Sequence, residues 1–299
     1  MNDRVQQIVQ EHLQQEIIKG TQITGRGHVN EIYVVTTRFA KYIVRIDLSE
    51  ATTDRFEKEA WCINEAAKFE VPGATVLGVG IKAGHPYMLM TYIDGKNGDE
   101  AGDTEKNKIW NALGKYARKI HSIPVEGYGE EMTAPGVFKD SWSHYVNYNI
   151  SSLVPNDKVI ELGVITRKES KKIKNVFIKL LDTDFTFGLI HYDLSLKNTI
   201  LTAQGMVSLI DWGSAKSAPV PHVDIAEILD SSLDEHSRQF ILFLEGYGFS
   251  VKDYEKIKPE IANINLLIYM DKLRWALDRN PEMIGYFSQE VRNKLRKIF

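Results

Sequence analysis

The chain has 299 residues, of which 43% are hydrophobic and 26% are charged. These are ordinary values for a globular protein, and the length allows two small domains or lobes, each with its own core. The formal net charge of -3 argues against a general nucleic-acid binder, because the counterion release that drives such binding needs an excess of Lys and Arg.

The single cysteine, Cys62, excludes a disulfide framework and a cysteine-based zinc site, so we expect a reducing, cytoplasmic compartment. The N-terminal stretch MNDRVQQIVQEHLQQEI has charges but no continuous apolar core, which predicts an amphipathic helix rather than a signal peptide. No apolar run approaches the roughly 18 residues that span a bilayer. We therefore expect a soluble intracellular protein with neither a nucleic-acid nor a membrane partner.

Residues 1–93 are rich in short β-strand patterns after the first helix. Segments with many Val, Ile, Tyr and Thr residues predict strands at 31–37, 41–48, 74–80 and 85–93. Between the two pairs, apolar residues recur at helical spacing from Phe56 to Ala67 and predict a helix over 52–69. The first part of the chain is thus predicted to be a small antiparallel sheet with one inserted helix.

A hinge and acidic linker is predicted at 94–105, DGKNGDEAGDTE, from its glycines and acidic residues. Beyond it, residues 106–299 are predicted to be mainly helical. Ile109, Leu113, Tyr116 and Ile120 line one face of a helix, and further helices are expected around 139–152, 157–182, 224–247 and 259–298. Short strand patterns return only at 189–211, as GLI, TILT and MVSLI, and the last two predict a hairpin.

That hairpin carries the stretch HYDLSLKNTI, residues 191–200, and its second strand runs directly into DWG, residues 211–213. Asp193, Asn198 and Asp211 are therefore expected at the ends of two paired strands, where their side chains converge. Magnesium takes oxygen ligands from one or two carboxylates or amides and completes its shell with phosphate and water. A further carboxylate can accept the proton of an attacking alcohol.

The pattern H-x-D-x-x-x-x-N, with Asp-x-Gly after the next strand, resembles the catalytic and metal-binding pair of the protein-kinase-like fold. The longer stretch LIHYDLSLKNTILTAQGMVSLIDWGSA, followed by VDIA at 223–226, resembles the aminoglycoside phosphotransferase family. KYARKIHSIPVEGYG, residues 115–129, is similar to a helix and Gly-aromatic-Gly segment of that family. The resemblance runs from about residue 20 to about residue 230. It implies an α+β, bilobal fold with an N-terminal nucleotide-binding lobe and a larger helical lobe that binds the acceptor.

Carried over residue by residue, the resemblance implies that Asp193 is the catalytic base and that Asn198 and Asp211 are the Mg²⁺ ligands. It also implies that Glu59 pairs with Arg45, which would face the phosphates of an ATP or GTP co-substrate.

Further residues are implied to bind the nucleotide. The segment 25–30, GRGHVN, would cover the phosphates through Gly25, Gly27 and Asn30. Ile43, Met90, Tyr92 and Ile93 would line the adenine side.

Two positions depart from the pattern. Asn30 replaces the third glycine of G-x-G-x-x-G, and Arg45 stands where most kinases have lysine. Arginine is longer, planar and always charged, so it clamps phosphate oxygens differently from a lysine point charge. The chain contains no G-x-x-x-x-G-K-[ST], which argues against a P-loop mechanism.

Several residues have a structural alternative. We expect His191 to be a structural hydrogen-bonding residue and Asp224 to be a helix N-cap before IAEIL. Lys197 is expected either to touch a phosphate or to point to solvent. The Arg45 and Glu59 pair is either an active-site pair or a surface pair of little value.

The acidic residues also allow two interpretations. They are either solvated loops or the lining of a cleft that attracts a polycationic aminosugar. The residues concerned are Asp94, Asp99, Glu100, Asp103, Glu105, Glu126, Glu130, Glu131, Asp230, Asp234 and Glu235.

The sequence therefore predicts transfer of the γ-phosphoryl of ATP or GTP to a hydroxyl of a small molecule. An aminoglycoside, and hence an antibiotic-resistance role, is the first expectation. A metabolite kinase for a choline-, homoserine- or sugar-like acceptor is the alternative, with Trp142, Tyr145 and Tyr148 either a cationic cage or packing residues. A nucleotide-binding pseudoenzyme that acts as an interaction module is a second alternative. The sequence does not distinguish a monomer from a dimer.

Overall fold

The computed structural model describes residues 2–23 and 30–299. Its N-terminal part is a five-stranded antiparallel sheet in the order β1-β2-β3-β5-β4. The strands are β1 (Lys19–Ile23), β2 (Asn30–Thr36), β3 (Lys41–Asp47), β4 (Val76–Lys82) and β5 (His85–Thr91). Four of them confirm the predicted strands. β1 was not predicted, because its sequence KGTQI offers one apolar side chain and its residues are largely exposed.

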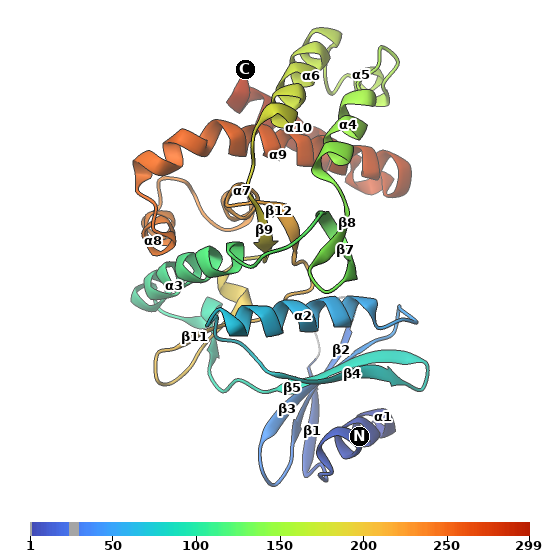
Figure 1. Ribbon diagram of the computed structural model, residues 1–299, viewed down its shortest axis with the longest axis vertical. Helices are drawn as coiled ribbons and strands as arrows, with labels where there is room; N and C mark the ends of the chain where they lie inside the picture. The colour runs from blue at the N-terminus through green and yellow to red at the C-terminus, as the bar shows by residue number, and fades with distance from the viewer. Residues whose placement is uncertain (1, 24–29) are drawn as a thin grey trace.

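Each face of this sheet is covered by a helix. Helix α1 (Asp3–Leu13) packs Val5, Ile8 and Val9 on the outer face, which confirms the predicted amphipathic helix. Helix α2 (Asp54–Lys68) packs Phe56 and Ala60 on the other face. Burial of a side chain such as Phe56 stabilises the fold by roughly 1.5–3 kcal/mol. Figure 1 shows α2 lying between the sheet and the rest of the chain.

The segment predicted as a linker carries structure of its own. It contains β6 (Lys96–Asn97), the 3₁₀ turn η1 (Gly98–Glu100) and the start of α3 (Asp103–His121). β6 pairs with β10 (Thr199–Leu201), which pairs in turn with β11 (Val207–Leu209). The chain leaving the first sheet is thus hydrogen-bonded to the predicted hairpin. The division of the chain at 93 and 105 stays a prediction.

The C-terminal part is mainly helical, as predicted, but its helices are more broken than the periodicity indicates. Turns at 162–166 and 232–237 interrupt two predicted helices, and Pro281 follows the end of the longest one. The helices are α4 (Trp142–Ser151), α5 (Lys158–Glu161), α6 (Arg167–Asp182), α7 (His222–Ser231), α8 (Arg238–Tyr247), α9 (Val251–Arg279) and α10 (Ile284–Ile298), with η3 (Pro281–Met283) between the last two. Among the described residues, none of these or the other helices is long and apolar enough to cross a membrane.

A second, four-stranded sheet lies within this part, in the order β8-β7-β12-β9. Its strands are β7 (Tyr128–Ala134), β8 (Val137–Asp140), β9 (Phe187–Ile190) and β12 (Lys216–Pro219). Only β9 was predicted, because β7 and β8 are short of alternating apolar residues and β12 ends in proline. The antiparallel pairing of Lys216 with Ile190 places the chain after Asp211 beside the start of the 191–198 loop.

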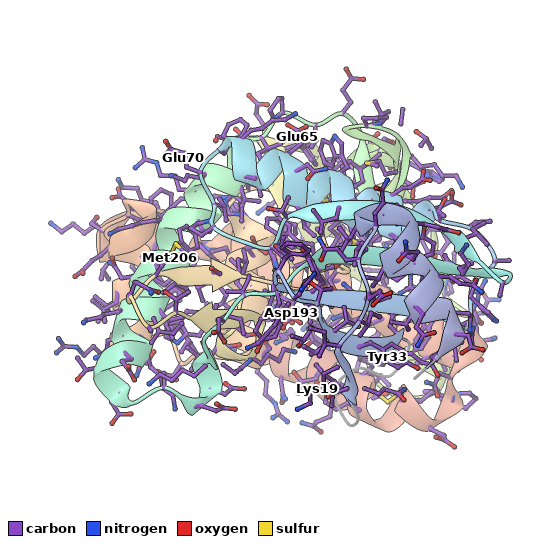
Figure 2. The ribbon with its side chains drawn as sticks, turned by 90° about the horizontal axis from the view of Figure 1, so that it is seen from below. Lys19, Tyr33, Glu65, Glu70, Asp193 and Met206 are labelled. Atoms are coloured by element: carbon purple, nitrogen blue, oxygen red, sulfur yellow. The ribbon has the colours of Figure 1, made fainter. Side chains whose placement is uncertain are left out.

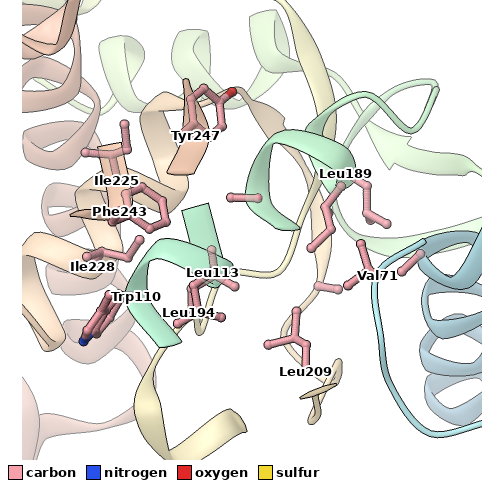
Figure 3. Close-up of a cluster of buried hydrophobic side chains, with 14 of the residues drawn as sticks. Val71, Trp110, Leu113, Leu189, Leu194, Leu209, Ile225, Ile228, Phe243 and Tyr247 are labelled. Atoms are coloured by element: carbon pink, nitrogen blue, oxygen red, sulfur yellow. The ribbon is translucent and has the colours of Figure 1, made fainter. Parts of the chain in front are cut away.

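The core of the C-terminal part joins α3, α7, α8 and the predicted hairpin (Figure 3). Trp110 and Leu113 of α3 contribute to the same cluster as Phe243 of α8, and Val71 reaches it from the end of α2. Helices α3 and α8 approach closely at a glycine. A Cβ on Gly114 would lie 2.0 Å from the carbonyl oxygen of Phe243, so any larger residue there would push the helices apart.

Candidate active site

The three residues singled out by the sequence lie at the base of one hairpin. Asn198 and Asp211 flank its strands β10 and β11, and Asp193 lies in the loop that precedes it. Asn198, in the 3₁₀ turn η2 (Leu196–Asn198), donates from Nδ2 to the carbonyl of Asp193 at 2.9 Å. Its own carbonyl accepts from the N–H of Ile210 at 2.9 Å, next to Asp211. Asp211 has a left-handed φ of 64°, a costly conformation for a non-glycine residue that is typical of functional sites. The Asp193 side chain is 27% exposed and is labelled near the centre of Figure 2.

The buried carboxylate of Asp224 holds the loop that contains Asp193. Asp224 accepts hydrogen bonds from the backbone N–H of Tyr192 at 2.8 Å and of His191 at 3.4 Å. It also contacts Nε2 of His121 at 2.9 Å, and the other nitrogen of that ring lies 3.0 Å from the hydroxyl of Tyr247. Tyr192 has a left-handed φ of 63°, so the bond from its N–H helps to hold a strained residue directly before Asp193.

The predicted capping role of Asp224 is therefore wrong. Helix α7 begins at His222 after Pro221, and Asp224 lies in its first turn rather than before it. Its carboxylate is committed to the backbone of a distant loop, which the residue pattern of one helix does not reveal.

His191 and Lys197 also find their partners within the hairpin. His191 is fully buried, its Nε2 lies 3.2 Å from the carbonyl oxygen of Ile210, and burial lowers the pKa of its ring. This confirms the expected hydrogen-bonding role. Lys197 is mostly exposed and pairs with the Asp193 carboxylate at 3.1 Å, so its ammonium group is neither simply in solvent nor remote from the site.

The predicted pair of Arg45 and Glu59 is present and buried. Nη1 of Arg45 on β3 donates to Oε1 of Glu59 on α2, and the two side chains are 15% and 3% exposed. Burial opposes the charge on Arg45, but the carboxylates of Glu59 and Asp211 outweigh it and raise the pKa of the guanidinium. This burial excludes a solvent-exposed surface pair. The influence of Asp211 also places Arg45 close to the end of the hairpin.

Asn30, which replaces a glycine of the expected phosphate loop, is tied to the same cation. The hydrogen-bond network assigns its amide oxygen to Arg45 Nη2 at 2.9 Å and its amide nitrogen to Asp47 Oδ2 at 3.3 Å. Asn30 and Asp47 face each other across β2 and β3. Gly25 and Gly27 lie outside the described residues.

The residues expected on the adenine side lie along β3 and β5. Ile43 and Met90 are direct partners across these strands, and Met90 belongs to the apolar cluster with Phe56. Tyr92 and Ile93 follow the end of β5 and are half-buried. The N–H of Tyr92 donates to the carbonyl of Lys41 at 3.2 Å, which continues the sheet pairing by one residue.

On the other side of Asp193 the structure adds residues that the sequence did not single out. Lys216 places its Nζ 3.3 Å from the ring centroid of Tyr192 and 2.9 Å from Oε1 of Glu130. Burial raises the pKa of the carboxyl group of Glu227 on α7, and the negative charge of Asp193 raises it further. Asp271 of α9 is affected in the same way by burial. The surroundings of Asp193 are therefore of mixed charge.

Most of the acidic residues noted in the sequence have a lysine partner. The pairs are Asp94–Lys41, Glu105–Lys96, Glu130–Lys216, Glu131–Lys139, Asp230–Lys294 and Glu235–Lys258. These side chains neutralise one another locally and do not form a uniformly acidic cleft.

Of the three aromatic residues considered as a cage, Trp142 and Tyr145 are packing residues and Tyr148 is exposed. Trp142 is buried, and Tyr145 lies against Tyr128 with their ring centroids 5.1 Å apart. Tyr148 is 49% exposed.

The donor set suits a hard cation such as Mg²⁺. The amide nitrogen of Asn198 is committed to Asp193, which leaves its oxygen as the ligand atom, and Asp211 supplies a carboxylate. Within 2–23 and 30–299, no group of three or more His, Cys, Asp and Glu side chains is arranged to hold a metal. Two protein ligands with phosphate and water would complete a magnesium site, whereas a structural zinc site would not form.

Comparison with known proteins identifies the family. The model of the phosphotransferase enzyme family matches residues 20–259. No curated protein sequence matches the chain.

Solved structures share its fold at low sequence identity. The complex of a thermostable mutant of aminoglycoside phosphotransferase APH(4)-Ia with AMP-PNP and hygromycin B has a TM-score of 0.69 and 17% identity, over 98% of both chains. The GDP and kanamycin complex of APH(2″)-IIIa has a TM-score of 0.66 and 16% identity, over 98% of both chains. A protein from Haemophilus somnus 129PT with the provisional name fructosamine-3-kinase has a TM-score of 0.63 and 14% identity, over 100% of this chain and 98% of that one.

These likenesses confirm the α+β kinase-like fold. The family match over residues 20–259 establishes that the chain belongs to the phosphotransferase enzyme family.

Proposed function

We propose that this enzyme transfers the γ-phosphoryl of ATP or GTP to a hydroxyl of a small molecule, with Asp193 as the base. The observation that carries the proposal is the hydrogen-bonded hairpin that links Asp193, Asn198 and the chain at Asp211. The buried Arg45 and Glu59 pair lies close to its end.

Asp193 would accept or orient the proton of the acceptor hydroxyl. The acceptor oxygen then forms a bond to the γ-phosphorus, the bond from that phosphorus to the bridging oxygen breaks, and a nucleoside diphosphate leaves. Asp224 holds the backbone on which Asp193 sits, so the carboxylate is positioned before the acceptor arrives.

Asn198 and Asp211 would hold Mg²⁺. When bound, the ion would neutralise and orient the nucleotide phosphates. Arg45 would add its guanidinium to the phosphate oxygens, and its two partners, Glu59 and Asn30, fix its direction. The residues Ile43, Met90, Tyr92 and Ile93 would contact the base. Gly25 and Gly27 would cover the phosphates.

We propose an aminoglycoside as the first acceptor to test. The proposal is supported by the fold shared with enzymes whose complexes contain hygromycin B or kanamycin. Glu227 supports it as well, because its half-buried carboxyl group near Asp193 is suited to an amino or hydroxyl group of the acceptor.

A second class, a sugar or other metabolite alcohol without several positive charges, is favoured by a different observation. Lys216 lies on the ring of Tyr192, the residue before Asp193, and neutralises Glu130, so this pair offers no excess of negative charge to a polycation there. The fold likeness to the protein provisionally named fructosamine-3-kinase points the same way.

A panel of acceptors separates these classes. Purified enzyme with Mg²⁺ and either ATP or GTP is mixed with kanamycin, hygromycin B, choline, homoserine or reducing sugars, and nucleoside diphosphate release is measured. Release that depends on an aminoglycoside supports the first class, and release that depends on another alcohol supports the second. Nucleotide binding without release for any acceptor would instead support a pseudoenzyme.

A cytoplasmic location is proposed with the enzyme role. It is supported by the single cysteine, which allows no disulfide bond within the chain.

A further inference from the structure

Helix α2 contacts the hairpin through a residue that neither the motifs nor the reaction scheme uses. The ammonium group of Lys58 donates to the carbonyl of Gly213 at 3.0 Å and to that of Ala215 at 2.9 Å. The residue is only 8% exposed. A buried ammonium group is unfavourable unless hydrogen bonds replace its water, so these two carbonyl groups are what keep Lys58 in place.

The two carbonyl groups belong to the turn that directly follows Asp211. That turn is tight, since the N–H of Ala215 donates to the carbonyl of Trp212 at 3.0 Å. It also contains the left-handed backbone of Asp211, which needs support from its surroundings. Lys58 holds this turn at two points, two and four residues beyond Asp211.

The neighbouring residue on α2 holds the other side of the site. Side chains of consecutive helical residues point about 100° apart, so Lys58 and Glu59 reach different partners. Glu59 binds Arg45, and the carboxylates of Glu59 and Asp211 both favour the charged form of that guanidinium. One turn of one helix thus fixes both the phosphate-facing cation and the turn that bears the candidate metal ligand.

The segment that follows α2 is attached to the same hairpin. The carbonyl of Pro72 accepts from the N–H of Leu209 at 2.8 Å, two residues before Asp211. Val71 is part of the core cluster that contains Leu209. Helix α2 and the segment after it therefore bind the chain on both sides of Asp211: Pro72 at Leu209 before it, and Lys58 at Gly213 and Ala215 after it.

We infer that Lys58 is a positioning residue for the metal site, which acts by holding the turn 211–215 so that the Asp211 carboxylate faces Asn198 and the nucleotide phosphates. The inference rests on the proposed function, in which Asp211 is a Mg²⁺ ligand. Residues that orient a metal ligand change metal affinity by about 10–100-fold when they are replaced. A purely structural lysine would change stability and leave metal affinity alone.

Three variants test this inference. Lys58→Met keeps a side chain of similar length but removes the N–H donors. Lys58→Arg keeps the positive charge and N–H donors in a different geometry. Lys68→Met is the matched control, because Lys68 lies on the same helix, is 66% exposed and pairs only with Glu65 among the described residues. For each protein, Mn²⁺ binding is measured by electron paramagnetic resonance in the presence of saturating AMP-PNP. The Mg²⁺ concentration for half-maximal turnover and the Tm without ligand are measured alongside.

We expect Lys58→Met to weaken Mn²⁺ binding and to raise the half-maximal Mg²⁺ concentration by about tenfold or more. The nucleotide KM at saturating Mg²⁺ should change less than about threefold, since the binding site for the base is untouched. Lys58→Arg should fall between Lys58→Met and the wild type, and Lys68→Met should match the wild type.

A folded Lys58→Met protein with a lower Tm and an unchanged affinity for Mn²⁺ would overturn the inference. If Lys58→Met does not fold, Lys58→Arg decides: weaker Mn²⁺ binding at a wild-type Tm supports the inference, and unchanged binding overturns it. Absence of Mn²⁺ binding and of Mg²⁺-dependent turnover in the wild type would overturn the proposed function as well. Normal wild-type behaviour with an unaffected Lys58 variant would overturn this inference alone.

Discussion

The side-chain amide of Asn198 donates a hydrogen bond of 2.9 Å to the backbone carbonyl of Asp193. The candidate base and one candidate metal ligand are therefore fixed to each other by a single contact, within a loop of six residues. The same amide can serve both purposes because its nitrogen donates to the loop and its oxygen remains for the ion.

Replacement of Asn198 should affect both the loop that holds Asp193 and the proposed metal site. We expect Asn198→Ala to lower turnover by about 10–100-fold and to raise the Mg²⁺ requirement, because a ligand and a loop contact are lost together. Asn97→Ala is the matched control, since the Asn97 amide donates to the neighbouring carbonyl of Lys197 at 2.8 Å but is not a proposed ligand. Initial rates over a range of Mg²⁺ concentrations make the comparison. Equal Mg²⁺ requirements in both variants would contradict the role of Asn198.

The buried ion pair of Arg45 and Glu59 predicts an effect on stability. Glu59→Ala leaves a buried guanidinium without its carboxylate, which costs about 3–5 kcal/mol in the free energy of unfolding. Glu65→Ala removes the partner of the exposed Lys68 on the same helix and should cost no more than about 1 kcal/mol.

Urea unfolding measures both variants, and the nucleotide KM reports the function of the pair. Glu59→Ala should raise the KM because Arg45 loses its direction. A loss of stability as small as that of Glu65→Ala would show that Arg45 and Glu59 do not depend on each other.

Asp224 predicts a loss of turnover without a loss of nucleotide binding. Asp224→Asn replaces a carboxylate that accepts from the N–H of Tyr192, so the strained loop before Asp193 is held less firmly. Charge-assisted hydrogen bonds of this kind contribute about 1.5–3 kcal/mol each. We expect kcat to fall while the Kd for AMP-PNP stays within about twofold of the wild type, a negligible difference in binding free energy. Asp234→Asn serves as the control on an exposed loop, and a kcat unchanged by Asp224→Asn would refute the supporting role.

The buried ring of His191 predicts a particular pH dependence of stability. Burial lowers its pKa, so the unfolded chain binds the proton more tightly than the folded protein does. The stability contributed by the neutral ring is therefore complete above the unfolded pKa of about 6.5 and is lost as the pH falls below it. The difference in unfolding free energy between wild type and His191→Asn should shrink by up to about 1.4 kcal/mol per pH unit below that value. Urea unfolding of both proteins between pH 7.5 and pH 5.5 gives this difference, and a difference that does not change with pH would mean that folding leaves the pKa of the ring unaltered.

The sequence predicts those helices and strands whose spacing of apolar residues matches the face that is buried in the fold. Strands β2 to β5 alternate or concentrate apolar residues because one or both faces are covered, and α1 shows its buried stripe. β7 does not, because its side chains are half-buried or exposed and its polar sequence YGEEMTA fits a turn equally well. The breaks near residues 163 and 281 depend on turns that helical periodicity does not register.

Some residues of the candidate site can likewise be predicted from the sequence, and others cannot. Asp193, Asn198 and Asp211 are recognisable because they are close in sequence: Asp193 lies five residues before Asn198, and Asn198 and Asp211 flank the two strands of one hairpin. The partners of Asn30, Lys58 and Asp224 are side chains or carbonyl groups far away in the chain. No pattern within a short window encodes such contacts, and only the packing of α2 and α7 against the hairpin brings them together.

The central claim, that Asp193 is the base for phosphoryl transfer, is tested most directly by one comparison. Wild type and Asp193→Asn are assayed for nucleoside diphosphate release with Mg²⁺, the better nucleotide and the acceptor found in the panel, and the Kd for AMP-PNP is measured for both. We predict that Asp193→Asn lowers turnover by about 10²–10⁴-fold, the usual contribution of a general base, with a Kd within about twofold of the wild type. Wild-type turnover in Asp193→Asn would contradict the account.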